Sequence, residues 1–524
     1  MGKKDKKKGK GAEKTALKTE KKTLNKIKKE LAAKGEDDIE MLIAQSQEKE
    51  PKVKVTVEEP CAQPSPRSGF SMCPHPDKDE LVMFGGEYYN GSKTTMFSDL
   101  YFYNLKKAQW TIVQCPEKPP PRSSHQAIVL SQQGGQMWVF GGEFASPTRS
   151  SFYHYKDLWV YHFSEKKWEQ IKAPGGPSAR SGHRMVASRK QIIVFGGFHE
   201  SLQDYKYFSD VYAFNLESYT WSKIEAVGKA PSPRSGCLLA PLTDGRILLY
   251  GGYCREKVKK DVDKGIAHTD MYYLQLDERT SPPKWKWVQA KPTGIPPSAR
   301  SGFYGAVTPN DVLYAFGGVQ DDHPDEERLT SVFRNELYSL DLARGRWMPV
   351  TIHGGKKLAT EGRKRRKGRE EEVDEEVAEV MEKAGISEGN EVKTYEDSIF
   401  TVKIGPSTSS KRPSSDVATV SDNSATEIFV PLARMSASLV VKSGILYMYG
   451  GQVEEEHRNL ILSDFYSLDV HKLDEWRTIV PYSTSNLEWL GSDESGSDDS
   501  DDDDGSSDED EDDSEEDDDD EMEA

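Results

Sequence analysis

The stretch PSARSGHRMVASRKQIIVFGG, residues 177–197, contains two signals that return along the chain. One is a proline–arginine segment, PSARSG, and the other is an apolar run that ends in two glycines. The paired glycines recur six times, at Gly85 and Gly86, Gly141 and Gly142, Gly196 and Gly197, Gly251 and Gly252, Gly317 and Gly318, and Gly450 and Gly451. The first four pairs are spaced 56, 55 and 55 residues apart. Self-similarity of this period indicates a repeat protein.

Three further markers accompany the paired glycines in every unit. The arginines of the proline–arginine segments are Arg67, Arg122, Arg180, Arg234, Arg300 and Arg434. An acidic residue after the glycines begins a short β-type run, at Asp99, Asp157, Asp210, Asp270, Glu336 and Asp464. A tryptophan follows, at Trp110, Trp168, Trp221, Trp285 or Trp287, Trp347 and Trp476. Each unit of about 50 residues therefore reads as four short strands, a blade that must stack on its neighbours to bury both faces.

The six-fold recurrence of four separate markers resembles the kelch family. The resemblance implies an all-β fold, a six-bladed kelch β-propeller with disordered or helical charged appendages. In kelch propellers that bind peptides, the residue after the arginine and those after the paired glycines line the mouth of the central channel. The first set is here Ser68, Ser123, Ser181, Ser235 and Ser301, with Met435 departing from the pattern. The second set is Glu87, Glu143, Phe198 with His199, Tyr253, Val319 and Gln452.

The recurring glycines, arginines and tryptophans are interpreted as structural. Paired glycines allow positive φ and close backbone approach where the blades crowd together. A tryptophan, taken as Trp287 in the fourth blade, should fill the gap between adjacent sheets. Six equivalent catalytic arginines would make no sense, and we expect each arginine to pair with the recurring acid of its own unit. Only the second mouth set varies between blades, so it is the better candidate for specificity.

The long segments after the glycines are rich in aromatic and charged residues that suit a partner interface. The segment of blade four is basic, through Arg255, Lys257, Lys259, Lys260 and Lys264. Blade five offers acids instead, at Asp321, Asp322, Asp325, Glu326 and Glu327. A mouth with one basic and one acidic side would orient a charged partner. The alternative is that these are ordinary solvated loops.

The closure of the ring is ambiguous from the sequence. Val55 lies 12 residues before Arg67, the same separation as from Trp110 to Arg122. This register predicts an outer strand at Val53 to Val57 that competes with, or lies beside, the Trp476 strand of the last blade.

Charged segments flank and interrupt the propeller. We expect a lysine-rich, partly helical arm at 1–50, blades one to five at 51–350, a disordered charged insert at 351–430, blade six at 431–485 and an acidic disordered tail at 486–524. The net charge is −18, and residues 491–524 alone contain 22 acids and no base. The helical arm is either a solvated, fraying helix or a basic helix that docks on RNA or an acidic surface.

The tail would repel itself, and it is either a solubilising tail or a segment that attracts basic proteins, more weakly as salt rises. It also contains candidate sites for an acidophilic kinase, at Ser492, Ser497, Ser506, Ser507 and Ser514.

Composition argues against several classes of protein. The five cysteines are odd in number and widely spaced, so neither a disulfide framework nor a zinc site is expected. No stretch approaches the ~18 apolar residues of a membrane span. The histidines lack the spacing of a copper oxidase site, and we expect no metal, no cofactor and no enzymatic activity. The expected protein is a monomer in the nucleus, the cytoplasm or both.

Three functions compete at this point. The leading hypothesis is a scaffold or adaptor that presents the propeller mouth to partner proteins. A variant is a substrate receptor of a ubiquitin ligase, which the lack of a visible BTB domain weakens. The other class is a ribosome-assembly or chaperone-like nuclear factor that uses its polyionic ends, with RNA as a possible partner of the basic segments.

Overall fold

The computed structural model describes residues 38–201, 204–259, 262–325, 328–354, 393–396, 401–404, 428–455, 458–483 and 489–490. Contacts divide the chain into two units, one of Met1–Thr351 with Val430–Ala524 and the other of Ile352–Phe429. In the second unit the described strands are β33 (Lys393–Glu396) and β34 (Thr401–Ile404), which pair antiparallel. The first unit is the six-bladed propeller.

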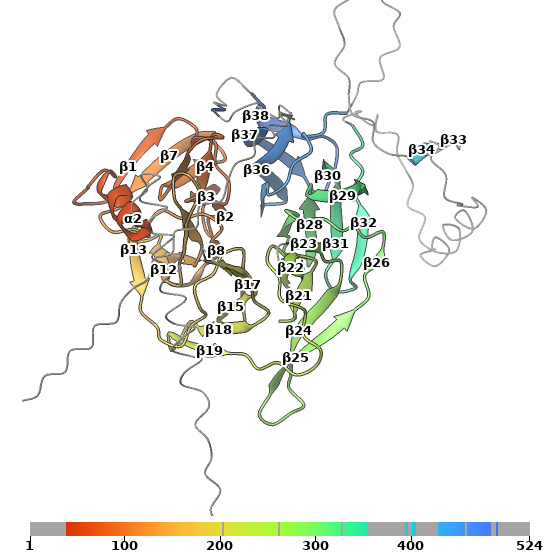
Figure 1. The fold of residues 1–524 in the computed structure, drawn as a ribbon, viewed down its shortest axis with the longest axis horizontal. Helices are drawn as coiled ribbons and strands as arrows, with labels where there is room; N and C mark the ends of the chain where they lie inside the picture. The colour runs from red at the N-terminus through yellow and green to blue at the C-terminus, as the bar shows by residue number, and fades with distance from the viewer. Residues whose placement is uncertain are drawn as a thin grey trace, which may run out of the picture. The chain divides into compact units, whose positions relative to one another are not determined.

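Each blade is one sheet built from a contiguous part of the chain (Figure 1). From inside to outside, blade one contains β2 (Ser71–Pro74), β3 (Glu80–Phe84), β6 (Leu100–Asn104), β7 (Gln109–Gln114) and β1 (Val57–Cys61). Blade two contains β8 (Gln126–Leu130), β9 (Gln136–Phe140), β12 (Leu158–His162) and β13 (Lys167–Ile171). Blade three contains β14 (Arg184–Ser188), β15 (Gln191–Phe195), β18 (Val211–Asn215) and β19 (Thr220–Lys223). A short 3-10 helix, η1 (Gln132–Gly134), connects β8 to β9.

The other three blades repeat the plan. Blade four contains β20 (Leu238–Pro241), β21 (Ile247–Tyr250), β24 (Met271–Asp277) and β25 (Lys284–Ala290). Blade five contains β27 (Tyr304–Val307), β28 (Val312–Phe316), β31 (Leu337–Asp341), β32 (Arg346–Pro349) and β26 (Thr293–Gly294). Blade six contains β35 (Ser438–Lys442), β36 (Ile445–Glu455), β37 (Arg458–Asp469) and β38 (Arg477–Val480). All neighbouring strands within a blade run antiparallel except β26, which is parallel to β32.

The ring closes through its innermost strands. In sequence, β2, β8, β14, β20, β27 and β35 each contact the next, and β35 contacts β2. The second strand of each blade is almost entirely buried, as the apolar runs before the glycines predict. A fold of six equivalent sheets around a common centre is therefore confirmed.

The tryptophans fill the gaps between blades. Each indole packs on the aromatic residue that precedes the paired glycines of the blade before it, with ring centroids 4.8–6.0 Å apart. The pairs are Trp168 with Phe84, Trp221 with Phe140, Trp287 with Phe195, Trp347 with Tyr250, Trp476 with Phe316 and Trp110 with Tyr449. The last pair joins blade one to blade six. Trp221 is half-buried and the other five are buried.

The paired glycines form a joint with the following blade. At the first pair, the Gly86 N–H donates to the carbonyl of Arg122 at 2.8 Å. Gly85 has a φ of +71°, and a Cβ there would lie 2.7 Å from the same carbonyl oxygen. Both the backbone conformation and the close approach require glycine, which explains its recurrence.

The outer strand predicted at Val53 to Val57 is wrong in position. The strand is β1, residues Val57–Cys61, and it pairs with β7 at the edge of blade one. It does not lie beside β38, because blade six already has four strands of its own. The seam is closed by side chains, and Gln63 donates to the Tyr449 hydroxyl at 3.2 Å and to the carbonyl of Ser463.

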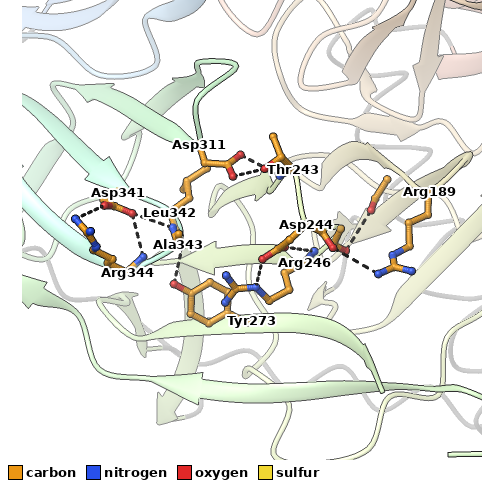
Figure 2. A network of polar contacts seen from close by, with 12 residues as sticks. Arg189, Thr243, Asp244, Arg246, Tyr273, Asp311, Asp341, Leu342, Ala343 and Arg344 are labelled. Carbon is orange, nitrogen blue, oxygen red and sulfur yellow. Dashed lines mark hydrogen bonds and ion pairs between the residues drawn. The ribbon is translucent and has the colours of Figure 1, made fainter. Parts of the chain in front are cut away.

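Polar contacts tie together the ends of blades three to five, mainly at the turns between their two innermost strands (Figure 2). The backbone N–H and hydroxyl of Thr243 donate to the Asp311 carboxylate at 2.9 and 2.6 Å. Arg189 donates to the carbonyl of Asp244, and the Tyr273 hydroxyl donates to the carbonyl of Leu342 at 2.7 Å. These turns lie at the end of each blade opposite the paired glycines, so this face is held together by its own side chains.

One helix, α2 (Ile39–Glu48), packs on the propeller. The Asp38 side chain caps it by accepting from the Glu40 N–H at 3.2 Å. Ile39, Leu42 and Ile43 pack on a cluster from blades one and two. This part of the predicted helical arm is therefore docked rather than solvated on all sides. None of the helices in the described part of the chain is long and apolar enough for a membrane span.

Candidate partner-binding face

Six ion pairs, each with a buried arginine, hold the blade ends. Every recurring arginine donates to the recurring acid of its own unit and to the carbonyl of the first paired glycine. The Nη1 or Nη2 to carboxylate distances are 3.4 Å for Arg67–Asp99, 2.8 Å for Arg122–Asp157, 2.6 Å for Arg180–Asp210, 3.0 Å for Arg234–Asp270, 2.8 Å for Arg300–Glu336 and 2.7 Å for Arg434–Asp464. The predicted pairing is thus present in all six blades.

Electrostatics agree with a structural role for these pairs. Burial alone would raise the pKa of Asp157, but the charge and hydrogen bonds of Arg122 outweigh it and hold that pKa below its ordinary value. Asp270 behaves in the same way beside Arg234. Each guanidinium also donates through Nε to the carbonyl two residues before it. A guanidinium with this many partners has little left to offer a ligand.

In every blade, the residues of the two predicted mouth sets pair with each other. Six isolated antiparallel bridges join the residue after the arginine to the residue after the paired glycines: Ser68 to Glu87, Ser123 to Glu143, Ser181 to Phe198, Ser235 to Tyr253, Ser301 to Val319 and Met435 to Gln452. Both backbone hydrogen bonds of every bridge measure 2.8–2.9 Å. Both sets therefore meet at one end of the blades.

The segments after the glycines are β-hairpins, which sequence reasoning treated as loops. They are β4 (Glu87–Tyr89) with β5 (Thr94–Met96), β10 (Glu143–Ala145) with β11 (Phe152–His154), β16 (Phe198–Glu200) with β17 (Tyr205–Tyr207), β22 (Tyr253–Lys259) with β23 (Val262–Ala267), and β29 (Val319–Asp325) with β30 (Arg328–Phe333). In blade six, β36 and β37 continue into an equivalent extension. The Asn90–Gly91 dipeptide was the available signal for the first hairpin. We call this side of the ring the hairpin face.

In blades one and two the hairpin face is acidic but internally satisfied. Glu87 accepts from Arg149 at 2.8 Å and from the Ser123 hydroxyl at 3.1 Å. Burial, with the charge of Glu87 adding, raises the pKa of Glu143 to about 8. His154 contacts the Ser181 hydroxyl at 2.7 Å. These side chains are buried and have partners within the chain.

The serines of the first mouth set differ in burial. Ser68, Ser123 and Ser181 are buried, whereas Ser235 and Ser301 are half-buried. The first three thus expose little surface to a partner.

In blades three and four the hairpins contact each other. Arg255 donates to Glu200 at 3.2 Å and lies over the Tyr205 ring, 4.5 Å from its centroid. Lys257 pairs with Asp204 at 2.8 Å, and the Tyr205 hydroxyl donates to Asp263 at 2.8 Å. The basic character predicted for blade four is therefore partly neutralised by blade three. Phe198 and His199 are half-buried beside this contact.

Only some of the charged residues predicted for the segments of blades four and five lie in described strands. Lys259 lies in β22, and Asp321, Asp322 and Asp325 lie in β29. Lys260, Glu326 and Glu327, together with the candidate kinase sites of the tail, lie outside the described residues.

Segments from both ends of the chain cover the hairpins of blades one and two. Helix α2 packs on β10 and β11, and Glu50 after it pairs with Lys118 at 2.9 Å. Trp489 contacts the Tyr89 ring with centroids 6.1 Å apart, and the Leu490 N–H donates to the carbonyl of Asn90 at 2.7 Å. The hairpins of blades three to five have no such cover from the described residues. Sequence reasoning missed this asymmetry.

The central channel contains a cavity of about 310 Å³ with lining residues from all six blades. Ser68, Glu87 and Gln452 line it at the hairpin face. Within the described ranges, no group of three or more His, Cys, Asp and Glu side chains could hold a metal ion.

Comparisons with known proteins point to the same architecture. The family described as "FBX42, beta-propeller domain" matches residues 67–265. Host cell factor homolog hcf-1 of Caenorhabditis elegans is 27% identical over 308 residues, 53% of this chain and 35% of that protein. Kelch domain-containing protein 3 of Homo sapiens is 28% identical over 222 residues, 41% of this chain and 55% of that protein.

A third relative is Kelch domain-containing protein 10 of Xenopus tropicalis. It is 29% identical over 189 residues, which are 34% of this chain and 40% of that protein. The chain thus aligns with between about a third and just over half of the length of these three relatives.

Proposed function

Because this chain belongs to the kelch-repeat β-propeller family, we propose that it is a non-enzymatic scaffold that binds partner proteins on its hairpin face. The observation that carries the proposal is the set of six bridges between the residue after the arginine and the residue after the paired glycines. They bring unequal side chains of six blades to one end of the blades, while the repeated residues are occupied in holding the blades.

The difference between the two ends of the blades supports the choice of face. The turns of blades three to five at the other end bond to one another through Thr243, Asp311 and Arg189. The hairpins instead carry aromatic and long polar side chains, which supply most of the binding energy at protein interfaces.

We place the partner on the hairpins of blades three to five. The hairpins of blades one and two are already in contact with α2 and Trp489. Blades three and four offer a cluster that includes Phe198, His199, Tyr205 and Arg255. Its mixture of rings and a stacked guanidinium fits a protein segment better than a small polar substrate.

The experiment is proximity labelling in cells with the wild type and a double variant, Tyr205→Ala with Arg255→Ala. We expect the variant to lose a defined group of labelled proteins. The matched control is Arg189→Ala with Glu278→Ala, which removes an exposed ion pair of 2.9 Å at the opposite end of the blades. An unchanged labelled set in a folded double variant would refute the choice of surface.

Repeating the purification with nuclease separates the competing class. An assembly factor should bring ribonucleoprotein particles whose recovery depends on intact RNA, whereas a protein scaffold retains its partners after RNA is digested.

A further inference from the structure

The central channel contains a positive charge without a negative partner. Among the residues that line the 310 Å³ cavity, the charged ones are Glu87 and Arg184. Glu87 is already paired with Arg149 outside the lining set, at 2.8 Å. Arg184 is only 7% exposed, and its side-chain hydrogen bonds within the described residues go to backbone carbonyls rather than to a carboxylate. Arg184 is therefore the charged side chain of the lining that lacks a counter-charge within the described residues.

The contacts of Arg184 show which donors remain. It is the first residue of β14, and its Nε donates to the carbonyl of Cys237 at 2.7 Å. Its Nη1 donates to the carbonyl of His183 at 3.3 Å, and the guanidinium lies over the Tyr304 ring, 4.5 Å from the centroid. Its Nη2 has no hydrogen-bond partner within the described residues. This side chain thus crosses blade four and reaches blade five with one donor unmet.

The recurring arginines provide the internal comparison. All six are buried and all six donate to a carboxylate. Since a guanidinium stays protonated in proteins, Arg184 cannot relieve its burial by losing a proton. A buried charge is normally paired, and a buried donor without an acceptor costs free energy.

The blade edges next to Arg184 lack a backbone hydrogen bond that most neighbouring blades have. Backbone hydrogen bonds link neighbouring blades at the mouth, from Ser124 to Gly69, Gly182 to Ser124, Gly236 to Gly182 and Ser436 to Gly302. In the described backbone no such bond joins Gly302 to Gly236, between blades five and four, or Gly69 to Ser436, between blades one and six. A Cβ on Gly236 would meet no atom within 4 Å. There is therefore open space at Gly236, the residue before the Cys237 carbonyl that accepts from Arg184.

We propose that the channel binds an anionic group of carboxylate or phosphate type, held by Arg184. Serine hydroxyls on the lining, from Ser124, Ser436 and Ser438, are neutral donors suited to the same ligand. The anion is either a free small anion or an acidic side chain of a partner that enters from the hairpin face. The second source rests on the proposed function, and the first does not.

The test is thermal unfolding of the purified protein at constant ionic strength, with sodium chloride replaced stepwise by sodium phosphate or sodium acetate. We expect a saturable rise of about 2–4 °C in the midpoint of the wild type, and no such rise in Arg184→Met. The matched control is Arg189→Met, five residues along the same strand pair but exposed and paired with Glu278. It should respond like the wild type.

A second titration identifies the source of the anion. The probes are the capped peptides acetyl-Gly-Glu-Gly-amide and acetyl-Gly-Gln-Gly-amide, which carry no terminal charge. A rise with the glutamate peptide alone assigns the site to an acidic side chain, and a rise with phosphate or acetate alone assigns it to a free anion.

Two outcomes overturn the proposal: no anion-specific rise in the wild type with any probe, or a rise that survives in Arg184→Met. If Arg184→Met does not fold, Arg184→Gln replaces it under the same criteria, and Arg184→Lys should retain a weaker response. The titrations contain no partner protein, so their result can be interpreted even if the proposed function is wrong.

Discussion

At the scale of single residues, identical side chains in this protein have different surroundings. The Arg434–Asp464 pair is fully buried on both sides, whereas Glu336, the partner of Arg300, has a side chain that is 42% exposed. The free energy lost with one partner depends on whether water can replace it. The six pairs are thus one motif with unequal contributions to stability.

Asp464→Asn should lower the free energy of unfolding by about 3–5 kcal/mol, because it leaves the buried Arg434 guanidinium without a counter-charge. The matched change Glu336→Gln should cost no more than about 1 kcal/mol, since water reaches that carboxylate. Urea denaturation of both variants measures the difference, and equal losses would contradict this account.

Buried histidines make the stability of the protein sensitive to acid. Burial, with the charge of Arg122 adding, lowers the pKa of His125 to about 3. Below about pH 6.5 this histidine binds a proton in the unfolded chain but not in the folded chain. The free energy of unfolding therefore falls as the pH decreases below about 6.5. His154, also buried, has its pKa lowered to about 3 as well.

His125→Phe should reduce the slope of the unfolding free energy against pH by about 1.4 kcal/mol per pH unit between about pH 6 and pH 4. Phenylalanine is a fair replacement, because Phe70 and Phe303 occupy the same repeat position in blades one and five. At pH 7 the variant should lose about 1 kcal/mol with the hydrogen bond to Ser71. Unfolding curves across pH give both values, and an unchanged slope would contradict the prediction.

At the scale of elements, the hairpins and α2 decide which part of the hairpin face is open. Ten residues make a marginal helix in isolation, so the stability of α2 comes from its contact with the propeller. Leu42 belongs to that contact, while Met41 beside it is 55% exposed.

Leu42→Asp should release α2 and leave the propeller folded. Amide hydrogens of residues 39–48 should then exchange at least tenfold faster, since an undocked helix unfolds. Met41→Asp is the control and should exchange like the wild type. Fast exchange in the wild type already would show that α2 is not docked in solution.

At the scale of the whole molecule, six blades close into a ring in which each sheet comes from one contiguous segment. Blade six takes all four strands from residues 438–480, and blade one takes its five from residues 57–114. The seam is therefore held by packing, mainly Trp110 against Tyr449 and Phe465, and by Gln63.

Trp110→Ala should lower the free energy of unfolding by about 3–5 kcal/mol, because it leaves a cavity at the seam. Trp221→Ala, at a half-buried position within the ring, should cost less. Denaturant unfolding compares the two variants, and a larger loss at Trp221 would contradict this prediction.

The sequence by itself determined the number of blades, the identity of the second and third strands in each, and the pairing of six arginines with six acids. Periodic signals carry such features, because every blade repeats the same local contacts at the same spacing. The Gly and Trp markers describe joints between neighbouring blades, which follow each other in the chain, and the Arg marker describes a contact within one blade.

Only the tertiary structure decided the features that occur once. The docking of α2, the covering of blades one and two, the placement of β1 and the unpaired Arg184 all depend on residues far apart in sequence. In the printed sequence Arg184 is an ordinary arginine after a repeated histidine. Its burial without a carboxylate follows from the shapes of blades four and five, which no local pattern encodes.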